Sequence, residues 1–144
     1  MLRNLYIAFP MLAALFAISV AQAASPTEVE GATTIDVATA KDLFDRSVPF
    51  IDVRGRRHYI PGHIPGAVHL RLGSGAFNES ALAEVVNKDQ EVVIYCNGPS
   101  CGASSEACEM AVSWNYKKVY YFRDGFPGWK AAGYSVGTTG ELTY

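Results

Sequence analysis

Val92-Val93-Ile94-Tyr95-Cys96 is the stretch of sequence that decides the fold. Its first four residues form an apolar run, rich in β-branched side chains and without the polar alternation of a half-exposed strand. Such a run indicates a strand buried on both faces, as in a parallel sheet that helices cover on its two sides. The strand leads directly into Cys96, so this side chain is expected at the end of a buried strand.

Similar strands recur along the chain and alternate with helical segments. Short apolar runs predict further strands around residues 35–37, 50–53, 67–70 and 119–122. Apolar spacing predicts helices at 39–45, 78–87, 103–114 and 127–132, with a Gly- and Pro-rich loop at 55–66. Thr39 is a candidate N-cap of the first helix. The alternation predicts a single α/β domain with a mostly parallel central sheet flanked by helices on both faces.

The N-terminus has the pattern of a secretory signal peptide. Arg3 supplies positive charge, the apolar run 5–20 follows, and Ala21-Gln22-Ala23 is typical of a cleavage site. An uncleaved anchor is the alternative, although the run is shorter than the about 20 apolar residues of a membrane span. The predicted organisation is a signal peptide at 1–23, a flexible lead-in at 24–34 and a folded domain at 35–140, in a periplasmic or secreted protein.

The charge balance limits the class of partner. The chain has 12 Lys and Arg residues against 14 Asp and Glu, a net charge of −2. Without Arg3 the counts are 11 and 14, a balance of −3. This mild acidic surplus argues against nucleic acid as a partner, and against a membrane surface once the signal peptide is removed.

The three cysteines, Cys96, Cys101 and Cys108, are odd in number and lie in one short stretch. A disulfide scaffold usually spreads an even number of cysteines along a small chain, so this cluster indicates chemistry. Backbone N–H groups at the start of a helix attract anions, and a thiolate held there has a lowered pKa. Cys96 is therefore the candidate nucleophile. The candidate substrate-binding residues of the turn after it are Asn97, Gly98, Ser100, Cys101 and Gly102.

Three segments leave the carboxyl ends of predicted strands: 54–58, 96–102 and 123–125. In open α/β sheets the ligand crevice lies beyond these strand ends, so the three segments are expected to meet in one pocket.

Several motifs resemble those of the rhodanese-like domains. Phe50-Ile-Asp-Val-Arg54 and Gly62-His-Ile-Pro-Gly-Ala67 are similar to the family's Asp-x-Arg and Gly-His-Ile-x-Gly-Ala signatures. Val92–Cys96 looks like its strand and active-site Cys, and Asp124-Gly-Phe-Pro-Gly-Trp129 like a closing element. The resemblance implies a sulfurtransferase without a cofactor. Cys96 would take a sulfane sulfur from a small anionic donor such as thiosulfate and pass it, as a persulfide, to a thiol or protein acceptor.

The cysteine loop departs from the family pattern, which often reads Cys-x-x-Gly-x-Arg-Ser. Here Pro99 stands at the Gly position, Cys101 at the Arg position and Gly102 at the Ser position. Loss of the Arg counts against the related loop-type phosphatases, which bind a dianion with it. Our hypothesis is that Arg57 or Arg123 replaces it in binding the donor; the alternative for each is a solvated or surface-paired side chain.

The remaining residues leave two alternatives open. Cys101 either resolves Cys96 by forming a disulfide with it or only fills the turn, whereas Cys108 is expected in the core. If the two loop cysteines shuttle sulfur or electrons between proteins, the chain is a thiol redox or sulfur-carrier module. An inert binding domain of the same fold is a further alternative. The presence of Cys96 argues against it.

Other polar residues are given structural roles. Asp52 and Arg54 are expected to pair with each other or with the backbone, and His63 to bond the backbone within its turn. The spacing of the three His residues matches no compact ligand set, so no metal is predicted.

Overall fold

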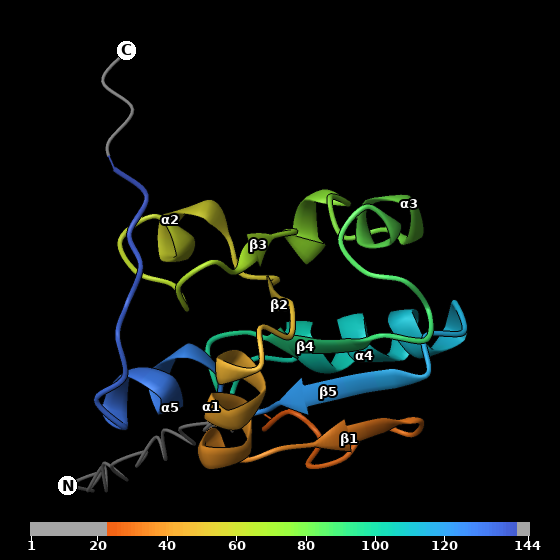
Figure 1. Cartoon of the computed structure of the whole chain (residues 1–144), viewed down its shortest axis with the longest axis horizontal. Helices are drawn as coiled ribbons and strands as arrows, with labels where there is room; N and C mark the ends of the chain where they lie inside the picture. Colours follow the sequence, from red (N-terminus) through yellow and green to blue (C-terminus); the bar gives the residue numbers. More distant parts are fainter. Residues whose placement is uncertain (1–22, 141–144) are drawn as a thin grey trace, which may run out of the picture.

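A five-stranded parallel sheet forms the centre of the protein. The structure, a computed structural model, describes residues 23–140. The strands are β1 (Ala32–Thr34), β2 (Phe50–Asp52), β3 (Val68–His69), β4 (Glu91–Tyr95) and β5 (Lys118–Phe122). Their order in the sheet is β1-β5-β4-β2-β3, and every pairing is parallel (Figure 1). The predicted α/β fold is confirmed.

Helices cover both faces of this sheet. They are α1 (Val37–Asp45), α2 (Arg56–Tyr59), α3 (Glu79–Ala83), α4 (Ala103–Ser113) and α5 (Gly125–Ala131), with a 3-10 turn at Leu72–Ser74. Figure 1 shows α1 in front of the sheet and α4 behind it. Alternate residues of β4 serve the two cores: Val92 and Ile94 pack with α3 and α4, and Val93 and Tyr95 with α1 and α5. The strand is buried on both faces, as its sequence predicts.

The segment 24–34 is part of the fold, which corrects the expectation of a flexible lead-in. Its residues 32–34 form β1, in register with Val119, Tyr120 and Tyr121 of β5. Val29 is only 4% exposed and joins the core on the α4 face. The expected strand at 35–37 therefore lies three residues earlier. Edge strands pair on one side only and tolerate polar residues, so Ala32-Thr33-Thr34 gives a weak apolar signal.

Two helix starts also differ from the expectation. The N-cap of α1 is Asp36, whose carboxylate accepts a hydrogen bond from the Thr39 N–H at 2.8 Å. Thr39 lies inside the helix. Within the expected loop 55–66, the Gly55 carbonyl accepts from the His58 and Tyr59 N–H groups, which starts the single turn of α2.

The expected signal peptide, 1–23, lies outside the described residues except for Ala23. Among residues 23–140, no helix is long and apolar enough to cross a membrane.

Candidate functional site

Cys96 lies immediately beyond the carboxyl end of β4 and is 2% exposed. Its carbonyl accepts a hydrogen bond from the Phe126 N–H at 3.0 Å, which fixes the start of the cysteine loop (residues 96–102) to α5. Gly125 makes this approach possible: a Cβ there would lie 2.3 Å from the Cys96 oxygen, and its φ is +59°. Gly98, with φ +100°, turns the loop over the same segment.

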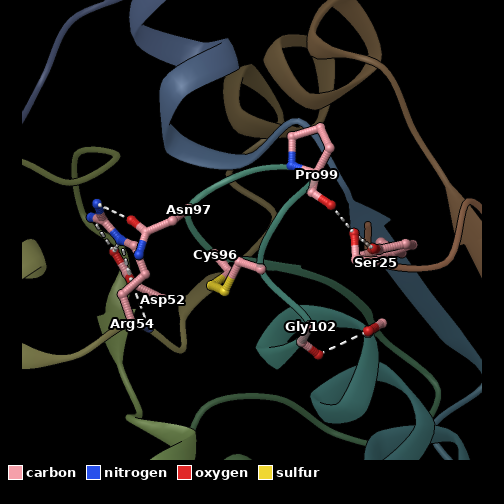
Figure 2. Close-up of a disulfide and its surroundings, with 10 residues drawn as sticks. Ser25, Asp52, Arg54, Cys96, Asn97, Pro99 and Gly102 are labelled. Atoms are coloured by element: carbon pink, nitrogen blue, oxygen red, sulfur yellow. Dashed lines mark hydrogen bonds and ion pairs between the residues drawn. A yellow bond between two sulfur atoms is a disulfide. The ribbon is translucent and has the colours of Figure 1, made fainter. Parts of the chain in front are cut away.

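A disulfide joins Cys96 to Cys101 across the loop, with 6.4 Å between their Cα atoms (Figure 2). The Cys101 N–H donates to the Gly98 carbonyl at 2.9 Å, which closes the turn that brings the second cysteine back. Cys101 is half-buried, and so it is the more exposed of the pair. The sequence leaves open whether Cys101 bonds to Cys96 or only fills the turn; in the structure it is bonded.

Cys108 takes no part in this loop. It is fully buried in α4 as a free thiol, in the core that β4 and β5 share with that helix. Burial raises the pKa of the Cys108 thiol, which suppresses the reactive thiolate. The expectation of a core residue is confirmed.

The sulfur pair opens into a hollow of about 580 Å³ at the carboxyl end of the sheet. Its lining combines the cysteine loop with α2 and the segment after β3. The lining residues are Val53, Arg54, Gly55, Arg56, Arg57, His58, Arg71, Gly73, Cys96, Asn97, Cys101 and Ala103. Four of them are arginines, and among these described residues there is no carboxylate. The hollow therefore offers a positive site for an anion beside Cys96.

Arg54 is the buried member of the arginine set, at 3% exposure. Its guanidinium donates to both Asp52 carboxylate oxygens, with Nη2 to Oδ2 at 2.7 Å, and to the Gly62 carbonyl at 2.7 Å. A longer contact of 3.5 Å joins Nη1 to the Asn97 side-chain oxygen (Figure 2). The expected pairing of Asp52 with Arg54 is confirmed, and it connects the end of β2 to the cysteine loop.

Apart from Arg123, the sequence-predicted binding residues fall into two groups. Asn97, Cys101 and Arg57 line the hollow. Gly98, Ser100 and Gly102 belong to the loop but not to the lining of the hollow.

Arg123 turns to the N-terminal segment and not to the hollow. Its Nε donates to the Pro26 carbonyl at 3.0 Å and its Nη2 to the Ser25 carbonyl at 2.9 Å. Ser25 in turn donates from its N–H (2.7 Å) and its hydroxyl (2.8 Å) to the Pro99 carbonyl (Figure 2). The predicted meeting of three strand-end segments is thus correct for 54–58 and 96–102, whereas 123–125 supports the loop from behind.

Arg71 is a lining residue that the sequence analysis does not single out. It follows β3, a strand of only two residues, and lines the hollow together with Cys96, Asn97 and Cys101 of the cysteine loop. The rule that selected the other segments, a polar side chain just beyond a strand end, also applies to it.

The histidines lie apart from any metal-binding arrangement in the part of the chain that the structure describes, where no three His, Cys, Asp or Glu residues gather to hold an ion. His63 Nδ1 lies 2.8 Å from the Tyr59 carbonyl, the backbone bond expected of it. Tyr59 stacks between His63 and His69, with ring centroids 3.9 and 4.3 Å apart.

Comparison with known proteins agrees with the motifs. The family model of the rhodanese-like domain matches residues 36–132. An HTH-type transcriptional regulator of Mycobacterium tuberculosis is 32% identical over 105 residues, which cover 70% of this chain. The chain spans only 44% of that relative's length.

Two solved structures share the fold. The rhodanese-like domain of an Anabaena protein has a TM-score of 0.62 at 22% identity, over 77% of this chain and 83% of the other. The polysulfide-sulfur transferase homodimer of Wolinella succinogenes has a TM-score of 0.60 at 18% identity, over 79% and 84%. Identities this low establish the fold alone.

Proposed function

Because the chain belongs to the rhodanese-like domain family, we propose that it is a sulfurtransferase that works through a persulfide on Cys96. The observation that carries this proposal is the position of Cys96, at the end of β4 in a hollow lined by four arginines. A thiolate is the nucleophilic form of cysteine, and positive surroundings lower the pKa of a thiol. The same charges attract an anionic sulfur donor.

The proposed reaction has two steps. The Cys96 thiolate attacks the outer sulfur of thiosulfate, the S–S bond of the donor breaks, and sulfite leaves with the bonding electrons. The Cys96 persulfide then passes its outer sulfur to cyanide, a thiol or a protein acceptor, and the thiolate is restored. Arg56, Arg57 and Arg71 are positioned to bind the anionic end of the donor. The disulfide must be reduced before the first step, because it occupies the Cys96 sulfur.

Intact-mass measurement of the reduced protein after incubation with thiosulfate tests the proposal. We expect a gain of one sulfur, its loss when cyanide is added, and no gain in Cys96→Ser. Cys108→Ala is the matched control, because Cys108 is buried away from the hollow and should leave the gain intact. A protein that takes no sulfur from thiosulfate or from inorganic polysulfide would contradict the proposal.

A second function, a thiol redox or sulfur-carrier module, is favoured by the disulfide between Cys96 and Cys101. Such a module would exchange its disulfide with partner thiols and form no sulfur adduct. The experiment above separates the two: a reversible disulfide without any adduct favours the module.

We also propose that the chain is exported, because residues 1–23 have the sequence pattern of a secretory signal peptide. Stable disulfides are typical of oxidising compartments, which agrees with export. Expression of the full chain followed by N-terminal sequencing of the exported protein should give Ala24 as its first residue, and recovery only of cytoplasmic chain beginning at Met1 would contradict this.

A further inference from the structure

We propose that the cysteine loop converts the Cys96 persulfide into hydrogen sulfide, with Cys101 as the resolving thiol and a dithiol as the external reductant. This inference rests on the proposed persulfide and adds a second outcome for it. The sulfur is released in reduced form and need not be handed to an acceptor. Three observations support it: the bond between Cys101 and Cys96, the greater exposure of the Cys101 residue, and the burial of Cys108 away from the pair.

The loop brings the Cys101 sulfur within bonding distance of the Cys96 Sγ, which would be the inner sulfur of the persulfide. In the structure the Cys101 Sγ is bonded to the Cys96 Sγ itself, which is the atom that carries the outer sulfur in a persulfide. The fold is therefore compatible with the product of attack at that atom. The hydrogen bond from the Cys101 N–H to the Gly98 carbonyl closes the turn that brings Cys101 back to Cys96. Ser25 holds the same turn by donating to the Pro99 carbonyl.

The step balances in atoms and electrons. The Cys101 thiolate attacks the Cys96 Sγ, the new S–S bond forms, and the bond to the outer sulfur breaks. That sulfur leaves as HS⁻ with the electron pair, taking the proton that the persulfide or the Cys101 thiol held. The sulfane sulfur is reduced by two electrons, and the two cysteines are oxidised to the disulfide. The positive lining of the hollow, with Arg57 and Arg71, stabilises the anion that leaves.

The difference in exposure between Cys96 and Cys101 determines which sulfur an external thiol attacks when the disulfide is reduced. Cys96 is 2% exposed whereas Cys101 is half-buried, so an incoming thiolate reaches the Cys101 sulfur first. Attack there forms a mixed disulfide on Cys101 and expels the Cys96 thiolate, the form that takes the next sulfur. The second thiol of the reductant then displaces the Cys101 thiol, and the reductant leaves as its own disulfide. A dithiol is thus consumed for each sulfide released.

The test is a single turnover without any added thiol. Reduced protein is loaded with thiosulfate, freed of excess donor, and followed by intact mass and by the sulfide released. We expect one sulfide for each persulfide lost, together with a protein two hydrogens lighter than the reduced form. Cys101→Ser should form the persulfide and keep it, with no sulfide until a thiol is added. Cys101→Ala serves the same purpose if the serine variant does not fold.

Controls separate this inference from the proposed function. Cys108→Ala should behave as the parent chain, which identifies Cys96 and Cys101 as the pair that forms the disulfide. If the parent chain and Cys101→Ser both load sulfur and hold it equally long, the resolving role is overturned and the sulfurtransferase proposal stands. If neither takes up sulfur from thiosulfate or from inorganic polysulfide, both proposals are overturned.

Discussion

The four arginines of the hollow have different roles because Arg54 is buried and the other three are exposed. Arg54 is held by Asp52 and Gly62, and its guanidinium lies over the Phe126 ring at 4.4 Å. Its charge is largely neutralised by the Asp52 carboxylate in contact with it, and removing Asp52 would leave a buried charge uncompensated. Arg56, Arg57 and Arg71 are exposed and line the hollow without a salt bridge among the described residues. We therefore assign donor binding to the exposed three and loop positioning to Arg54.

Replacing Arg57 or Arg71 by Ala is expected to weaken the binding of thiosulfate. Each change should raise the KM for thiosulfate roughly two- to fivefold, the effect of losing one solvent-screened ion pair. The kcat should change less, and the difference in KM should shrink at high ionic strength because salt screens exposed charges. Steady-state sulfur transfer to cyanide measures both quantities.

Arg46→Ala is the matched control for these variants. Arg46 is also exposed, but it pairs with Glu91 at 3.0 Å and does not line the hollow. Its removal should leave the KM for thiosulfate as in the parent chain. Unchanged KM values in both Arg57→Ala and Arg71→Ala would contradict the assignment of these arginines to the donor.

The sequence identified the strand ends but not the directions of the side chains that follow them. The sequence gives Arg57 and Arg123 equal standing as candidates for donor binding, since both closely follow a predicted strand. Only the structure separates them, because Arg123 finds carbonyl partners in Ser25 and Pro26, almost a hundred positions away. A pairing this distant has no local sequence signal.

The cysteine loop depends on the close approach of the start of α5. Gly125→Ala should misplace Cys96, because the added Cβ would meet the Cys96 carbonyl at 2.3 Å and the Gly98 nitrogen at 2.9 Å. We expect a destabilisation of about 2–4 kcal/mol, from the clash and from the left-handed φ of +59° together. Urea unfolding measures the first effect, and the rate of sulfur uptake under folding conditions measures the misplacement of Cys96.

Gly133→Ala separates strain from clash. Gly133 has a similar left-handed φ of +81°, but an added Cβ there would meet nothing within 4 Å. Its cost should be about 1 kcal/mol, from the backbone alone, with sulfur uptake unaffected. Equal losses in the two variants would show that the contact between Gly125 and the cysteine loop has no special importance.

The elements that the sequence predicted best are those with strong apolar patterns. The sequence locates β4 and β5 because Val92–Tyr95 and Val119–Phe122 are apolar runs, and α4 because its apolar residues recur at helical spacing. The sequence places β1 three residues too late and gives no sign of α2, because neither element has a strong apolar pattern of its own. β1 depends on its pairing with β5, and the single turn of α2 has no buried residue.

The N-terminal segment connects the edge of the sheet to the reactive loop. From Ser25 to Thr34 it bonds the Pro99 carbonyl, buries Val29 and completes the sheet with β1. Tyr121 of β5 reinforces this path by donating to the Pro26 carbonyl at 3.1 Å. The family model covers residues 36–132 and therefore omits this segment. The contact of Ser25 with the Pro99 carbonyl, which anchors the cysteine loop, therefore comes from residues outside the range that the family model matches.

A chain that begins at Ile35 should therefore be less stable than one that begins at Ala24. The truncation removes β1, one of the two strands that pair with β5, together with the buried Val29 side chain and the hydrogen bonds of Ser25 to the loop. The loss of one buried aliphatic side chain and several hydrogen bonds should lower the free energy of unfolding by about 3 kcal/mol, which corresponds to a fall in Tm of roughly 10 °C for a domain of this size.

Ser25→Ala in the longer chain is the comparison variant. It removes the hydroxyl bond to Pro99 and leaves β1 in place, so it should lower the free energy of unfolding by about 1 kcal/mol and the Tm by only a few degrees. Thermal unfolding of the three reduced proteins decides the matter. Equal Tm values for the chains beginning at Ala24 and Ile35 would mean that 24–34 is a free lead-in, as its small polar residues first suggest.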